Sequence, residues 1–240
     1  MIELRKTIRS TLNFTFVTLF PNLIEPYFHD SILKRAVDSK LISYDFKNPR
    51  DYTTNKHMKV DKQMIGGGAG MLMTCQPLFD CLDEIKKQNP NAHIIFPLAA
   101  AKPFKQNDAK RLATKENVVF VSGRYEGIDE RVIEKYANEV FSIGDFILTG
   151  GELPSLTMAD AISRNVPEVL GNADSLTIES YEDNLLEAPS FAKPENFKNF
   201  TVIKEYLKGN HSKIHDLKNS LSICKTKYYR PDLVTNKKAK

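Results

Sequence analysis

Hydrophobic residues in the first part of the chain alternate between short continuous runs and stretches of helical spacing. Runs that suit the strands of a parallel sheet lie at 13–19, 93–96, 118–121 and 139–143, and a further short apolar run lies at 41–44. Apolar residues recur at helical spacing at 32–37, 77–85, 106–115, 128–136 and 154–164. Because strand and helix alternate, the sequence predicts an α/β layer with a parallel sheet up to about residue 165.

Two segments lack this periodicity. Residues 45–70 are rich in Asp, Asn, Pro, Lys and Gly, which predicts a long loop, and loops of that length inside a compact domain are usually functional. Residues 167–192 contain Pro167, Gly171, Pro189 and scattered acids, which predicts a linker. Helical spacing returns at 202–207 and 214–224. We therefore predict an α/β domain at 1–166, a linker at 167–192 and a small, basic helical domain at 193–240.

Composition and charge narrow the class of protein. The 240 residues are 41% hydrophobic and 27% charged, as in ordinary globular proteins. The net charge of +4 hides an uneven distribution, because residues 193–240 carry 12 Lys or Arg against 4 Asp or Glu. A basic segment on a mildly acidic body favours a partner with a phosphate backbone. A solvated lysine-rich surface that binds nothing is the alternative that charge alone leaves open.

Other features of the sequence argue against a membrane span, a secretory signal, a disulfide framework and a metal site. The longest apolar run, Ile94–Ala101, is far shorter than the roughly 20 residues that a membrane-spanning helix needs. The N-terminal segment has no small-residue cleavage site, so no secretory signal is predicted. The three cysteines match neither a disulfide framework nor a zinc pattern, and the pair His211 and His215 lacks a third ligand nearby. We expect a cytoplasmic protein with reduced thiols, no membrane association and no metal-ligand cluster.

Glycine-rich segments fall where predicted strands end: Gly66–Gly70, Gly123–Gly127, and Gly144 with Gly150 and Gly151. Ligands of open α/β sheets bind outside the carboxyl ends of the strands, where glycines let the backbone approach them closely. The first segment is followed by Met71 rather than by Lys and Ser or Thr, which excludes a P-loop, and no Gly-x-Gly-x-x-Gly opens a helix. One such segment alone is usually a tight turn. Three together predict a pocket lined by backbone.

Four longer runs carry a specific resemblance: GGGAGMLM at 66–73, GRYEGIDERVI at 123–133, SIGDFILTGGELP at 142–154 and VPEVLG at 166–171. In this order and spacing they resemble the bacterial TrmD family of tRNA (guanine-N1)-methyltransferases, from about Phe16 to Leu233. The resemblance implies a SPOUT-type α/β fold with a deep trefoil knot and a small helical C-terminal domain. It also implies a homodimer with a shared active site, and transfer of a methyl group from S-adenosylmethionine to N1 of the guanosine 3′-adjacent to the tRNA anticodon.

The same resemblance implies the site residues. The cofactor would lie bent in the knot, with its adenine held by backbone groups of three loops. The residues implied to bind it are Pro97, Leu98, Gly123, Arg124, Tyr125, Ser142, Ile143, Gly144, Asp145, Phe146, Ile147, Leu148, Gly150 and Gly151. Glu126 matches a family carboxylate near the methyl donor, and Mg²⁺ is a second cofactor to test. The expected tRNA-contacting side chains in the basic segment include Lys208, His211, Lys225, Lys227 and Arg230.

The chemistry requires a base, because guanine N1 is a poor nucleophile until its proton is removed. A cation near O6 would then stabilise the developing negative charge. In the family, a linker aspartate and an arginine at the end of the last knot helix take these roles. Arg164 matches the arginine, whereas Glu179 stands where the family has its aspartate, and Asp174 and Asp183 are the alternative bases.

A second departure from the family pattern lies at residues 98–101, where Leu-Ala-Ala-Ala replaces the frequent Ser-Pro-x-Gly. The two departures define the first alternative function, a non-catalytic tRNA-binding protein that keeps the fold. The other alternative, a nucleotide-dependent phosphotransferase, would require a phosphate-binding lysine and a magnesium carboxylate at family spacing, and the sequence has neither.

Overall fold

The computed structural model of the protein describes residues 11–172 and 178–235. The chain divides into two compact units between Gly171 and Asn172. The first unit contains a sheet of five strands in the order β2-β1-β6-β5-β7, and every pairing in it is parallel. The strands are β1 (Leu12–Val17), β2 (Ile42–Lys47), β5 (His93–Pro97), β6 (Asn117–Val121) and β7 (Glu139–Phe141). The predicted parallel sheet and its four predicted strands are confirmed, and the short apolar run at 41–44 falls in a fifth strand, β2, that was not predicted.

Both faces of this sheet are buried, which explains why its strands read as continuous apolar runs. Successive side chains of a strand point to opposite faces. Phe14, Phe16 and Phe120 therefore belong to one hydrophobic cluster, whereas Val119 and Val121 belong to the other. The rings of Phe16 and Phe120 stack at a centroid distance of 5.6 Å across the β1–β6 pair.

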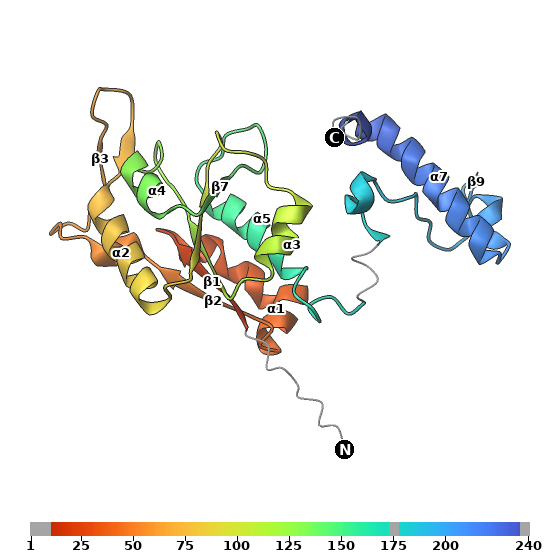
Figure 1. The fold of residues 1–240 in the computed structure, drawn as a ribbon, viewed down its shortest axis with the longest axis horizontal. Helices are drawn as coiled ribbons and strands as arrows, with labels where there is room; N and C mark the ends of the chain where they lie inside the picture. Colours follow the sequence, from red (N-terminus) through yellow and green to blue (C-terminus); the bar gives the residue numbers. More distant parts are fainter. Residues whose placement is uncertain (1–10, 173–177, 236–240) are drawn as a thin grey trace, which may run out of the picture. The chain divides into compact units, whose positions relative to one another are not determined.

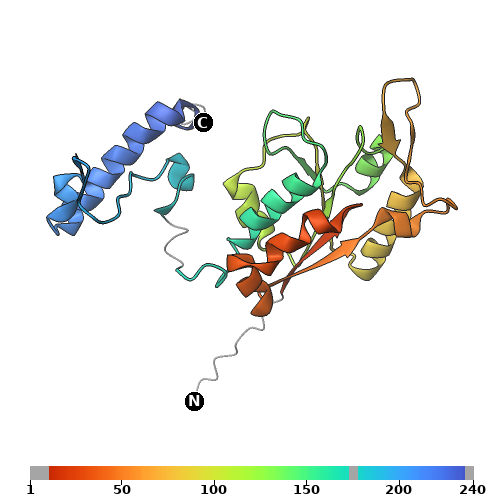
Figure 2. The same cartoon turned by 180° about the vertical axis from the view of Figure 1, so that it is seen from behind.

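Helices cover both faces of the sheet (Figures 1 and 2). Leu33, Leu112 and Ile162 pack into the first cluster, and Leu82 and Val132 into the second. The helices of the first face are α1 (Ser31–Asp38), α3 (Gln106–Leu112) and α5 (Glu152–Ser163); those of the second are α2 (Cys75–Gln88) and α4 (Glu130–Tyr136). All five helices were predicted, and Pro77 lies in the first turn of α2, where its missing N–H is tolerated.

The prediction of a long loop over residues 45–70 is wrong in part. The segment contains the end of β2, the short helix η3 (Pro49–Tyr52) and the strand β3 (Asp61–Gln63), which pairs antiparallel with β4 (Met71–Met73). This hairpin joins the body through a hydrogen bond from the N–H of Met73 to Gly127 O, at 3.0 Å. Its strands have only three residues each, which is too short for an apolar alternation to mark them in the sequence.

The second unit is dominated by one long helix, α7 (His211–Tyr229), drawn in blue in Figure 1. Its N-cap is Asn210, whose side chain accepts a hydrogen bond from Lys213 N. The predicted helix at 214–224 is confirmed and is longer than predicted, whereas the one at 202–207 is a short 3-10 helix, η5 (Lys204–Leu207). The other elements are η4 (Glu182–Asn184), β8 (Asn196–Phe197), β9 (Phe200–Thr201) and α8 (Pro231–Thr235). In the described ranges no helix is long and apolar enough to span a membrane.

Candidate active site

A cavity of about 450 Å³ lies at the carboxyl ends of β5, β6 and β7, where open α/β sheets bind ligands. The loops that follow these three strands supply its walls. The predicted cofactor residues that line it are Pro97, Leu98, Gly123, Arg124, Tyr125, Ser142, Ile143, Gly144, Phe146, Ile147, Leu148, Gly150 and Gly151. Asp145 is absent from the lining. Ala99, Glu126, Gly127, Ile128, Phe141 and Pro154 complete it.

Two of the loops approach each other closely because Gly151 has no side chain. Its N–H donates to Gly123 O at 2.8 Å. A Cβ at this position would lie 2.8 Å from both Gly123 N and Ser122 Cα, which is closer than real Cβ atoms come. Gly144 has a φ of +157°, and the ring of Phe146 occupies the space where a Cβ would stand. The sequence signal for these walls was the glycines themselves.

Free backbone donors lie along the third loop. Within the described residues, the backbone N–H groups of Ile147, Leu148 and Gly150 donate to no protein acceptor. The Ile147 side chain is 83% exposed, so this loop borders the open side of the cavity. Backbone groups of this kind are ready to bind the polar edge of a flat ligand.

A largely buried ion pair stabilises the loop between β7 and α5. Arg124 Nε lies 2.9 Å from Glu152 Oε2, and the Glu152 side chain is 3% exposed. The other carboxylate oxygen of Glu152 accepts a hydrogen bond from Thr18 Oγ1 at 2.8 Å. Arg124 Nη1 also donates to Thr149 O at 3.2 Å, and the guanidinium stacks 4.6 Å from the ring centre of Phe20. Arg124 therefore fixes the loop that precedes α5.

Glu126 lies on the cavity wall and is held there by the β3–β4 hairpin. Its N–H donates to Met71 O at 2.9 Å. Its carboxylate passes over Gly70, where a Cβ would meet Glu126 Oε1 at 2.6 Å. The glycine-rich segment Gly66–Gly70 thus accommodates a carboxylate and does not line this cavity, so the prediction that all three glycine segments form one pocket is wrong.

The other two predicted catalytic residues do not line this cavity. Arg164 follows α5, and at 1.5 Å per residue it lies roughly 18 Å along the helix from Glu152, whose neighbours form the wall. Burial raises the pKa of Asp160, one turn before Arg164, and the Arg164 charge opposes that shift. Glu179 belongs to the second unit and lines a cavity of about 610 Å³ there, together with Asp183 and His215. Asp174 lies outside the described residues.

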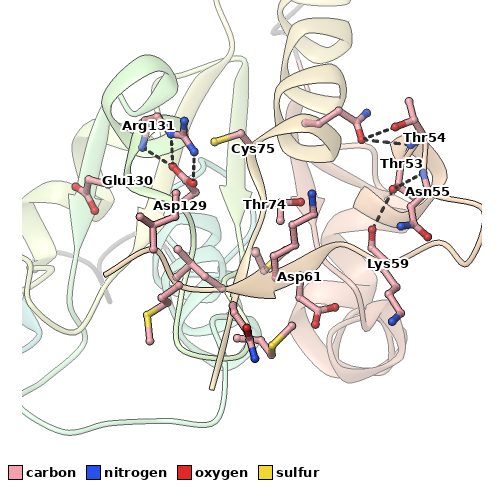
Figure 3. Close-up of a pocket in the computed structure, with 18 residues that line it drawn as sticks. Thr53, Thr54, Asn55, Lys59, Asp61, Thr74, Cys75, Asp129, Glu130 and Arg131 are labelled. Atoms are coloured by element: carbon pink, nitrogen blue, oxygen red, sulfur yellow. Dashed lines mark hydrogen bonds and ion pairs between the residues drawn. The ribbon is translucent and has the colours of Figure 1, made fainter. Parts of the chain in front are cut away.

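A larger cavity of about 1250 Å³ lies between the hairpin and the first turns of α2 and α4 (Figure 3). Arg131 binds Asp129 through two hydrogen bonds of 2.9 and 2.7 Å, and this pairing holds the pKa of the Asp129 carboxyl well below its usual range. Burial raises the pKa of the neighbouring Cys75 thiol. The sequence predicted a long loop at 45–70 but not this cavity, because its lining residues are far apart in the chain and the hairpin pairing brings them together.

Charged ligands for a metal do not gather at either cavity. In the ranges that the structure describes, no group of three or more His, Cys, Asp or Glu side chains is arranged to hold a metal ion.

The fold and the cavity define an α/β protein with a candidate small-ligand site at the carboxyl ends of parallel strands. The sequence profile of the family described as tRNA (Guanine-1)-methyltransferase TrmD matches residues 12–236, and the chain belongs to this family. A tRNA (guanine-N(1)-)-methyltransferase of Sulfurovum sp. (strain NBC37-1) is 66% identical over 94% of this chain and 100% of its own length. Those of Sulfurimonas denitrificans and Campylobacter curvus are 64% and 62% identical, over 92% of this chain and 96% and 94% of their own lengths.

Proposed function

We propose that this protein transfers a methyl group from S-adenosylmethionine to N1 of the guanosine 3′-adjacent to the tRNA anticodon. The observation that carries the proposal is the backbone-lined cavity at the ends of β5, β6 and β7, in a member of a tRNA (Guanine-1)-methyltransferase family. The cofactor, the exact base and the residue roles below are parts of this proposal.

The cavity residues fit an adenosine-containing cofactor. A volume of about 450 Å³ lies within the roughly 300–1,000 Å³ typical of small-molecule sites. Adenine presents both donors and acceptors at its edge, and the N–H groups of Ile147, Leu148 and Gly150 are placed to bind the acceptors. Leu98 and Ala99 replace the serine and proline of the family pattern, and backbone recognition tolerates the loss of the serine hydroxyl because it uses no side chain.

When bound, S-adenosylmethionine supplies an electrophilic methyl group on a sulfonium. Glu126 places a carboxylate on the cavity wall, where a negative charge favours a cationic ligand. Arg124 holds the loop at 149–151 against its own loop, the one after β6, and so keeps the wall in shape. The apolar side chains of Leu98, Ile143 and Leu148 restrict water around the reacting atoms.

Glu179 would remove the proton from guanine N1. A carboxylate is a competent base here if it reaches hydrogen-bond distance of that proton. As the proton leaves, negative charge develops at O6, and the guanidinium of Arg164 would stabilise it. The family has an aspartate at the position of Glu179, so the extra methylene requires the segment around it to sit slightly further back.

We further propose the knotted topology and the homodimer that the family resemblance implies. A shared site would explain why Arg164 lies a helix length away from the cavity of its own chain. Helix α5 is suited to an interface because it is apolar on most sides, and Leu153 in its first turn remains 58% exposed. Domain boundaries at residues 166 and 192 remain our proposal for the knotted, linker and helical parts.

The basic side chains of the second unit would bind the tRNA backbone. Lys208, Lys225, Lys227 and Arg230 belong to a segment with 12 basic and 4 acidic residues. Each neutralised phosphate releases counterions, so the affinity for tRNA should fall as salt rises. A role for Mg²⁺ would then be tested by adding the ion or a chelator to the methyl-transfer assay.

Methyl transfer to an unmodified tRNA tests the proposal directly. Labelled methyl is supplied as S-adenosylmethionine, and a tRNA with guanosine 3′ of its anticodon is compared with the same tRNA carrying adenosine there. Product on the guanosine tRNA alone supports the proposed function. The departures at Glu179 and at residues 98–101 favour one rival, a non-catalytic tRNA-binding protein, which predicts tRNA binding with no product on either RNA.

A further inference from the structure

The segment that carries Glu179 forms a tight loop. Tyr181 N donates to Leu185 O at 2.7 Å, and Glu187 N donates to Ser180 Oγ at 3.1 Å. Tyr181 and two of the residues inside the loop have positive φ values between 51° and 78°. These hydrogen bonds close the loop by joining residues 180–181 to residues 185–187. Contacts that hold residues 185–187 therefore also set the position of Glu179, two residues before Tyr181.

Helix α7 holds this closed end of the loop through the backbone N–H and the backbone C=O of Leu186. Thr226 Oγ1 accepts a hydrogen bond from Leu186 N at 2.8 Å, and Ser222 Oγ donates to Leu186 O. The two hydroxyls lie four residues apart, on one face of α7. Both polar groups of Leu186 are thus satisfied by side chains of the helix, in place of the partners that a regular strand would supply.

Few other side chains could take the place of Thr226, because the position is buried and its hydroxyl both donates and accepts a hydrogen bond. It is completely buried, and its hydroxyl also donates to Ser222 O at 2.7 Å, so the donor and an acceptor site are both in use. Removal of the hydroxyl leaves the Leu186 N–H without its partner, which favours release of the segment from the helix. Arg230, just after α7, adds a second contact because its guanidinium lies 5.8 Å from the ring centre of Tyr181.

We propose that Thr226 and Ser222 are positioning residues for methyl transfer, which fix the base-carrying segment to α7 through Leu186. This inference rests on the proposed function, in which Glu179 removes the N1 proton. The contact would matter for rate because a catalytic group displaced by about an ångström can lose on the order of 100-fold.

The test compares Thr226→Val, which has the same shape without the hydroxyl, with Thr226→Ser, which keeps it. Ser220→Ala is the matched control on α7, since the Ser220 hydroxyl is exposed and donates only to Asp216 O. Amide hydrogen exchange of the peptide 180–187 measures how firmly this segment is held to α7, and it does so independently of activity. We expect faster exchange in Thr226→Val, with values like those of the unaltered protein in Thr226→Ser and Ser220→Ala.

Steady-state kinetics then separate positioning from folding. We expect Thr226→Val to lower kcat by roughly 10- to 100-fold with the KM for S-adenosylmethionine unchanged, and Thr226→Ser to restore most of kcat. Ser222→Ala should give a smaller loss, because a carbonyl tolerates the loss of a partner better than an N–H does. Faster exchange with unchanged kcat in Thr226→Val would overturn the inference, because the segment would then be released with no effect on the reaction. Unchanged exchange in Thr226→Val would overturn it as well, because Thr226 would then not hold the segment. If the unaltered protein transfers no methyl group, the proposed function fails, while the exchange result stands by itself.

Discussion

Arg124 and Glu152 form a charged pair that is largely withdrawn from water beside the cavity, which makes it a sensitive point of the candidate site. Arg124→Met keeps the length of the side chain but leaves the buried carboxylate uncompensated. We expect the free energy of unfolding in urea to fall by about 3 kcal/mol, because removing one partner of a buried pair strands the other charge. The double variant Arg124→Met with Glu152→Met should recover much of this loss. An equal or larger loss in the double variant would show that the charge is not the cause.

The identity of the base is tested by changing one atom of a carboxylate. Glu179→Gln has nearly the same shape but cannot take up the N1 proton, so we expect kcat to fall by at least about 100-fold, within the range of general-base effects. Affinity for tRNA, measured by filter binding, should stay within about twofold. Asp183→Asn, on the same loop, is the matched control and should keep its turnover. Normal turnover in Glu179→Gln with a loss in Asp183→Asn would move the role to Asp183.

The three thiols should react in an order set by burial. Cys224 is exposed, Cys75 is partly buried, and burial raises the pKa of Cys81 to about 12. Only the thiolate is alkylated, so at pH 8 iodoacetamide should modify Cys224 first and Cys81 only after unfolding, as read by mass spectrometry. Because the folded pKa of Cys81 is raised above the ordinary 9.0, its contribution to stability is complete below pH 9 and is lost as the pH rises towards 12. Early labelling of Cys81 would contradict this burial.

Much of the cavity could be predicted at the residue scale, because its walls are backbone and glycine marks where backbone must come close. Gly123, Gly144 and Gly151 were visible in the sequence for that reason. The buried pairing of Arg124 with Glu152 was not, since it joins residues 28 positions apart on different elements, at 2.9 Å. Spacing along a chain gives no direct measure of such distances.

At the scale of elements, the loop after β6 and the start of α5 contact each other backbone to backbone at Gly151. A Cβ on Gly151 would meet Gly123 N and Ser122 Cα at 2.8 Å, so Gly151→Ala should push the two loops apart. We expect a loss of roughly 1–3 kcal/mol in stability, as for other overpacked sites. A thermal shift on adding S-adenosylmethionine should shrink as well. Gly171→Ala is the control, because a Cβ there meets nothing within 4 Å. Equal behaviour of the two variants would contradict this account.

The elements themselves followed from the sequence wherever both faces of a strand or one side of a helix are buried. The strands β1, β5, β6 and β7 and the helices α1 to α5 belong to this class, whereas β2, which is mostly half-buried, was visible only as a short apolar run. The hairpin of β3 and β4 was not predicted because each strand has only three residues and the hairpin is joined to the loop at 126–129 by backbone hydrogen bonds. Such tertiary contacts leave no period in the sequence.

At the scale of the whole molecule, charge and chemistry are separated along the chain. Residues 1–192 carry 22 basic and 26 acidic residues and contain the cavity, whereas residues 193–240 carry 12 and 4. The basic part therefore suits the RNA backbone and the acidic part a small cationic cofactor. Glu179 lies in the second unit and Arg164 at the end of α5, so neither belongs to the cavity wall of this chain.

Subunit complementation tests whether a homodimer assembles the site from two chains. Ala99→Trp fills the cavity from an exposed position, and Arg164→Ala removes the guanidinium; each variant alone should be inactive. If the cavity of one subunit works with Arg164 of the other, a mixed dimer contains one intact site and one site with both defects. Refolding an equal mixture should then restore about one quarter of the normal turnover, because about half of the dimers are mixed. If each site lies within one chain, every site in the mixture carries a defect and no turnover returns. Absence of recovery in dimers shown to be mixed, by two affinity tags, would reject the shared site and require Arg164 to reach the cavity of its own chain.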